Sequence, residues 1–118
     1  MAWNVEVTDE FTEWYDDPGE ADDDAVSAAI EYRIQRGPSL GRPFVDTIDR
    51  SRLANLKELR PKRSDIRILF VFDSRHTAIL LLGGSKTNDW QGWYDRNIPV
   101  AERLYASYLA EIKKDEVV

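Results

Sequence analysis

Three apolar segments separated by short turns constrain the fold more than any other feature of this chain. The segments are Leu53–Arg60, Ile66–Phe72 and Thr77–Leu82, and each is rich in Ile, Leu, Val or Phe. Ile66–Phe72 is typical of a strand that is buried for much of its length. Asp73–His76 is a tight turn, and strands joined by such short connections pair as neighbours in an antiparallel meander. The third strand is expected to end at Gly83-Gly84.

The N-terminal third predicts a strand followed by two helices. Residues 3–8 alternate apolar and polar side chains, which indicates a short strand with one apolar face. Thr8 or Asp9 is expected to cap a helix that ends near residue 17. Apolar residues at helical spacing predict a second helix over about residues 20–36.

A loop with a short edge strand is expected over residues 39–48, and a polar segment over residues 85–90. The last helix is expected to begin near Asp89, to bend at Pro99 and to end near Lys114. This order of elements predicts an α+β fold in which a strand and a helical hairpin pack on a curved, mainly antiparallel sheet, followed by a C-terminal helix. The helices are expected on one face of that sheet. With 118 residues, a single domain over 1–118 is expected.

Charge is divided very unevenly along the chain, although the formal net charge is −6. Residues 1–32 hold eleven acids and no Lys or Arg, whereas residues 33–103 hold fourteen bases against eight acids. The acidic run is explained as the solvated face of the helical hairpin, with acids where the helix dipole favours them. The basic half predicts a locally positive surface that attracts polyanions, so nucleic acid is the first partner to consider.

Several classes of site are excluded or disfavoured by composition. The chain has no Cys and one His, which excludes disulfides, thiolate zinc sites and a histidine metal cluster. His76 is expected in an exposed turn. Gly83–Thr87 lacks the spacing of a phosphate-binding P-loop, and Glu58, Asp65 and Asp73 form no pattern suited to a metal. No membrane span or signal peptide is visible, so we expect a cytoplasmic protein without metal or cofactor.

Three basic residues lie where strands of the predicted meander begin or end. Arg60 ends one strand, Arg67 begins the next, and Lys86 follows the third. Side chains at such positions can meet on a ligand, and Arg and Lys together suit phosphate groups. The alternative is ordinary: Arg67 points to solvent or pairs with Asp65 or Glu58.

Aromatic residues follow these bases. Trp90, Trp93 and Tyr94 are spaced as i, i+3 and i+4, and aromatic rings beside bases suit nucleotide stacking. The same spacing also packs a helix onto a sheet, which we favour for the two tryptophans. Tyr94 is more open to a chemical role, because its hydroxyl can take part in proton transfer.

The order and spacing of several short motifs resemble the RelE/ParE toxin superfamily, and most nearly its HigB, or phage Gp49-like, branch. The resemblance covers about residues 53–109. The motifs are Leu59-Arg60, Ile66–Phe72, Ile79–Thr87, Ile98-Pro99 and Ala101–Arg103.

This resemblance implies the toxin of a bacterial type II toxin–antitoxin module. The implied activity is translation inhibition by a metal-independent endoribonuclease (an mRNA interferase) that cuts messages on the ribosome, with the 2′-hydroxyl of the RNA attacking the phosphate. Arg60, Arg67 and Lys86 match the basic positions of the family, and Tyr94 is added as an aromatic or acid–base candidate. The implied partners are a helix-turn-helix antitoxin, the ribosome and messenger RNA. Further RNA-binding candidates are Arg50, Arg52, Lys57, Lys62, Arg63 and Trp90.

Two other functions fit the same resemblance. The chain could be a non-catalytic inhibitor of DNA gyrase, as in the ParE branch. It could also be an inactive phage-derived member of the family that only binds its antitoxin.

Overall fold

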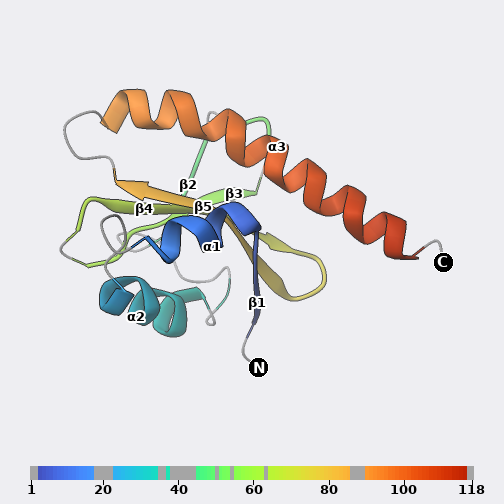
Figure 1. The fold of residues 1–118 in the computed structure, drawn as a ribbon, viewed down its shortest axis with the longest axis horizontal. Helices are drawn as coiled ribbons and strands as arrows, with labels where there is room; N and C mark the ends of the chain where they lie inside the picture. Colours follow the sequence, from blue (N-terminus) through green and yellow to red (C-terminus); the bar gives the residue numbers. More distant parts are fainter. Residues whose placement is uncertain are drawn as a thin grey trace.

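The computed structural model describes residues 3–17, 23–34, 37, 45–49, 51–53, 55–62, 64–85 and 90–116. Its strands and helices alternate as the sequence indicated (Figure 1). In chain order they are β1 (Asn4–Val7), α1 (Asp9–Tyr15), α2 (Asp23–Arg33), β2 (Val45–Thr47), β3 (Leu56–Leu59), β4 (Ile66–Asp73), β5 (Thr77–Ser85) and α3 (Trp90–Glu116).

The sheet has the order β1-β5-β4-β3-β2. The predicted meander of β3, β4 and β5 is confirmed, because both of its pairs are antiparallel. β1 joins the edge of β5 in parallel, and β2 pairs antiparallel with β3 at the other edge. The expected strand 53–60 is shorter in the structure, since only Leu56–Leu59 are paired.

One register shift bends the β4–β5 ladder. Phe70 faces Leu80 but Leu69 faces Leu82, so Leu81 is an extra residue on β5. Such a bulge increases the local twist of a sheet. The expected curvature of the sheet therefore has a specific origin near its centre.

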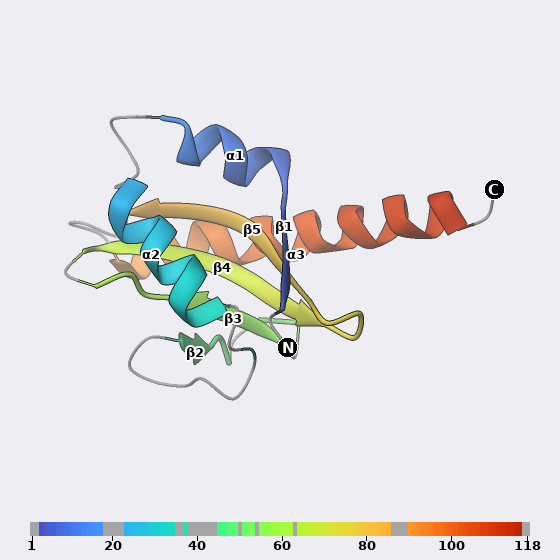
Figure 2. The ribbon, with the colours of Figure 1, turned by 90° about the horizontal axis from the view of Figure 1, so that it is seen from below.

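The helices cover both faces of the sheet. Figures 1 and 2 show α1 and α2 on one side and α3 on the other. The expectation of helices on a single face was wrong, because β4 and β5 are apolar on both sides. Alternate residues of β4, such as Phe70 and Val71, belong to different buried clusters.

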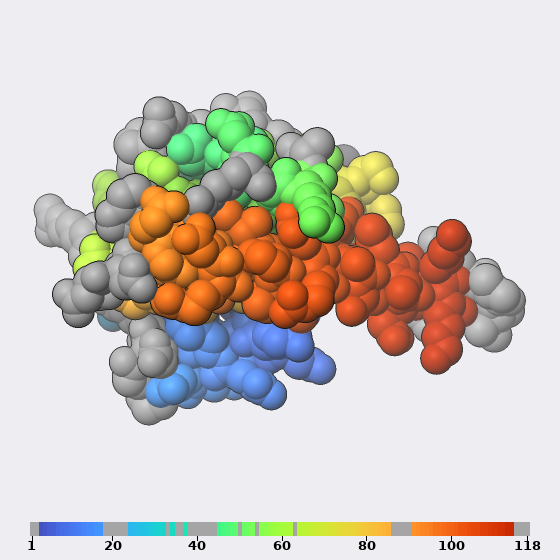
Figure 3. All heavy atoms as spheres, turned by 90° about the horizontal axis from the view of Figure 1, so that it is seen from above, coloured from blue at the N-terminus to red at the C-terminus, as the bar shows by residue number. Residues whose placement is uncertain are grey.

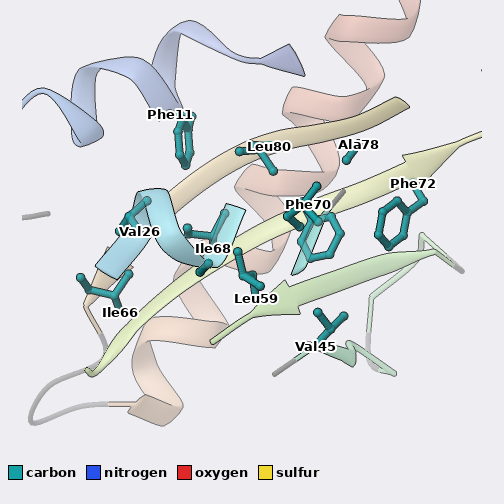
Figure 4. Close-up of a cluster of buried hydrophobic side chains, with 12 residues drawn as sticks. Phe11, Val26, Val45, Leu59, Ile66, Ile68, Phe70, Phe72, Ala78 and Leu80 are labelled. Carbon is teal, nitrogen blue, oxygen red and sulfur yellow. The ribbon is translucent and has the colours of Figure 1, made fainter. Parts of the chain in front are cut away.

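The core beneath α1 and α2 is built from inward residues of the sheet and one aromatic anchor of α1 (Figure 4). Phe11 points from α1 toward Leu80 of β5, and Phe70 lies between the strands and α2. Thr8 caps α1 through its hydroxyl, which accepts the Phe11 N–H at 3.0 Å and donates to the Leu81 carbonyl. The cap therefore also ties α1 to β5.

The core on the other face is covered by the first half of α3. Trp93, Tyr94, Ile98 and Ala101 are buried against β4 and β5. Pro99 lies inside this helix and is exposed. The end of α3 extends beyond the rest of the molecule, which measures 45 × 32 × 29 Å (Figure 3). No described helix is both long and apolar enough to cross a membrane.

The turn at 73–76 is confirmed, but His76 is half-buried rather than exposed. Its ring stacks on Trp3 with the ring centroids 4.1 Å apart, and Trp3 also contacts the edge of Phe72. His76 therefore belongs to the packing between β1 and the β4–β5 turn.

Candidate functional site

Strand alternation and register bring two of the predicted basic residues together. Leu56, Glu58 and Arg60 lie two residues apart, so they share the face of the sheet that α3 covers. Leu59 pairs with Ile68, and continuing that antiparallel register by one residue sets Arg60 opposite Arg67. The neighbouring positions of the two arginines follow directly from the predicted meander.

A buried carboxylate forms the centre of this cluster. The side chain of Glu58 is only 2% exposed. Its Oε1 accepts the Arg60 Nε–H at 2.7 Å, and its Oε2 accepts the Tyr94 hydroxyl at 2.5 Å. Arg60 also donates to Asp46 of β2 at 3.1 Å. These charge-assisted hydrogen bonds join β2, β3 and α3.

Glu58 is the residue that sequence reasoning missed, since it was assigned to a turn or edge position. A signal was present: it lies between Leu56 and Arg60 on the same face of one strand. An acid at an inward position needs partners. The partner hydroxyl comes from Tyr94, 36 residues away, which strand alternation alone does not reveal.

Arg67 is held by main-chain groups. Its Nη1 donates to the carbonyls of Ile66 at 2.7 Å and Ser64 at 3.3 Å. Its Nε–H is buried and has no hydrogen-bond partner within the described part of the chain. A buried guanidinium donor left unused is an unusual cost, which an anionic ligand can remove.

The electrostatics of the cluster keep Tyr94 neutral. Burial, and then its hydrogen bond to Glu58, raise the pKa of Tyr94 to about 12, against a weaker opposite effect of Arg67. Burial alone would lower the pKa of Arg60, but Glu58 and Asp46 outweigh it and raise that pKa. Tyr94 therefore acts as a hydrogen-bond donor, and both arginines stay charged.

The raised pKa of Tyr94 predicts a loss of stability at high pH. Because the folded state holds this proton more tightly than the unfolded chain, its contribution is complete below the model value of 10.0. That contribution is lost as the pH rises through about 12. Chemical denaturation at rising pH should show a steeper fall for the wild type than for Tyr94→Phe. Parallel falls would show that Tyr94 has an ordinary pKa.

Trp93 packs against the strand next to Arg67. Arg67 pairs with Gly84 of β5, and a Cβ at Gly84 would lie 2.6 Å from Nε1 of Trp93. The preference for a core role is confirmed for Trp93, which is 6% exposed. The side chain of Trp90 lies outside the described residues.

Gly84→Ala is expected to lower the free energy of unfolding by about 1–3 kcal/mol, the usual cost of overpacking. The added methyl group would force the indole of Trp93 away from β5. Urea denaturation followed by tryptophan fluorescence measures this. A variant as stable as the wild type would mean that Trp93 does not sit on Gly84.

The remaining predicted residues are distributed differently. Lys86, Arg50 and Arg63 lie outside the described residues. Arg52 and Lys62 are exposed. Lys57 projects from the opposite face of β3, where its Nζ donates to Thr47 at 3.1 Å. The structure therefore does not bring Lys57 to the cluster.

Arg52 lies instead beside the middle of α3. Its main-chain N–H and the Ser51 hydroxyl both donate to Oε2 of Glu102, at 2.5 and 2.8 Å. Arg52 and Arg103 line an open groove there. Among the described side chains, no group of three His, Cys, Asp or Glu could hold a metal ion.

Comparisons with known proteins agree with this architecture. The family model described as phage-derived protein Gp49-like matches residues 13–106. A Mycobacterium tuberculosis protein with the provisional name toxin HigB3 is 50% identical over 86 residues, which are 73% of this chain and 75% of that protein. The similarly provisional toxin HigB2 of the same organism is 40% identical over 116 residues. That match covers 96% of this chain but only 57% of HigB2.

A solved structure shares the fold. The copper-bound form of a mutant toxin from Helicobacter pylori superimposes with a TM-score of 0.56 and 19% sequence identity. The match covers 70% of this chain and 93% of the other. At this level of identity the likeness concerns the fold alone.

Proposed function

The chain belongs to the family of phage-derived Gp49-like proteins, and from this premise we propose that it is the toxin of a bacterial toxin–antitoxin module. The names of its two mycobacterial relatives support this assignment. The resemblance of the meander motifs to HigB-like toxins supports it independently of those names.

The proposed activity is endonucleolytic cleavage of messenger RNA on the ribosome, which inhibits translation. The observation that carries it is the position of Arg67: a half-buried guanidinium with an unused Nε–H, beside Tyr94 and Arg60. A phosphate at this place would accept hydrogen bonds from Arg67. As the RNA 2′-hydroxyl attacks the adjacent phosphorus, the fixed positive charge would stabilise the charge that builds on the phosphate oxygens.

The other residues have different roles in this proposal. Tyr94 offers a neutral hydroxyl as a donor, since its pKa is about 12. Arg60 is held by two carboxylates, so its main task is to fix Glu58 and the charge of the cluster. Lys86 follows β5 directly after Ser85, which pairs with Ile66 beside Arg67. It is proposed as a second phosphate-binding residue.

The proposed partners are a helix-turn-helix antitoxin encoded beside the toxin, the ribosome and messenger RNA, all in the cytoplasm. The basic candidates outside the cluster, such as Arg52, would contribute non-specific attraction to RNA phosphates.

The direct test is a purified bacterial translation reaction programmed with one defined message. Added protein is expected to cut the message within its coding region only while ribosomes translate it, as read by primer extension. A parallel supercoiling assay with DNA gyrase should be unaffected. An intact message together with inhibited gyrase would establish the ParE-like alternative instead, and no effect in either assay would indicate an inactive family member.

A further inference from the structure

An apolar groove opens on the face of the sheet opposite Arg67. It has a volume of about 270 Å³ and lies between β1, α1 and α2, the three elements nearest the viewer in Figure 2. Its apolar lining consists of Val5, Val7, Phe11, Tyr15, Ile30 and Leu80. A groove of this size accepts one or two apolar side chains of another molecule.

The groove is continuous with an unpaired sheet edge. β1 is the end strand of the sheet, and no strand in the described ranges pairs with its outer edge. Val7 ends β1, lines the groove and is 47% exposed. Exposed edge strands next to apolar pockets are common sites for binding an added segment of another protein.

The charge around this groove has one sign. Glu31 lines it, and Glu10, Glu13 and Asp24 are exposed on the two helices that form its walls. Residues 1–32 contain no Lys or Arg to offset them. The complementary ligand is a peptide segment that carries apolar side chains next to Lys or Arg. A second copy of this chain would present the same acids and be repelled.

We propose that this groove, with the outer edge of β1, is the docking site of the antitoxin. The inference rests on the proposed function, because it assumes that a protein partner exists. A DNA-binding antitoxin is rich in Lys and Arg, which gives it the required charge. The groove and Arg67 lie on opposite faces of the sheet. The antitoxin segment seated here would therefore leave the phosphate-binding face uncovered.

The test is the affinity of the full chain for the antitoxin encoded beside it, measured by calorimetry at two salt concentrations. Val7→Arg places a charge in the groove and is expected to weaken binding at least tenfold. Glu31→Lys reverses a wall charge and should weaken binding more at low salt than at high salt.

Matched controls lie at the far end of α3. Leu109 is 44% exposed, close to Val7, and Glu111 is exposed like Glu31. Leu109→Arg and Glu111→Lys should bind within twofold of the wild type. Growth arrest by each variant without antitoxin reports that it is folded.

Two failures are distinguishable. A wild-type complex that survives Val7→Arg and Glu31→Lys unchanged would overturn the docking site alone. A wild-type chain that neither arrests growth nor binds the antitoxin would overturn the proposed function, and the docking site with it.

Discussion

Replacing Arg67 by Ala is expected to abolish growth arrest while leaving the protein folded. The guanidinium is the group whose Nε–H lacks a partner in the described structure, and we propose that it binds the scissile phosphate. Removing one such charge stabiliser costs about 10²–10³ in rate in enzymes of known mechanism. The two hydrogen bonds that it makes go to neighbouring carbonyls, so the loss of stability should be about 1 kcal/mol or less.

Lys57→Ala is the matched control for this variant. Lys57 is also a base on the meander, but it lies on the opposite face and contacts Thr47. It should remain as toxic as the wild type at equal expression. If Arg67→Ala is folded and still arrests growth, the assignment of the site to the Arg67 face is wrong.

Glu58→Ala is expected to have the largest effect on stability, lowering the free energy of unfolding by about 2–3 kcal/mol. The substitution leaves the buried Tyr94 hydroxyl without its acceptor and removes the closest carboxylate from Arg60. It also opens a cavity between β3 and α3. Glu58→Gln should cost less, because its amide oxygen can still accept from Tyr94.

Urea unfolding of both variants tests this order. The expected ranking of stability is wild type, then Glu58→Gln, then Glu58→Ala. In Glu58→Ala the pKa of Tyr94 should also fall from about 12, because a hydrogen bond that raises it has been removed. Equal stability of the three proteins would contradict a central role for the carboxylate.

The sheet and part of the cluster could be predicted from the sequence because they depend on local patterns. Short turns require β3, β4 and β5 to be neighbours, and antiparallel pairing then sets Arg60 beside Arg67. Strand alternation also indicates which residues share a face, although the inward position of Glu58 was not used.

What the sequence did not predict depends on contacts between distant elements. The pairing of Tyr94 with Glu58 requires α3 to cross the sheet at one particular place. The side on which α3 packs was predicted wrongly, because apolar residues on both faces of β4 were interpreted as one buried strand, without asking what covered each face. The stacking of His76 on Trp3 likewise joins chain segments more than 70 residues apart.

The most direct test of the proposed activity is a map of RNA 5′ ends in bacteria after brief induction of the wild-type chain and of Arg67→Ala. New ends inside the coding regions of translated messages, present with the wild type and lost in Arg67→Ala, are predicted. Growth arrest with unchanged message ends would contradict the ribonuclease account.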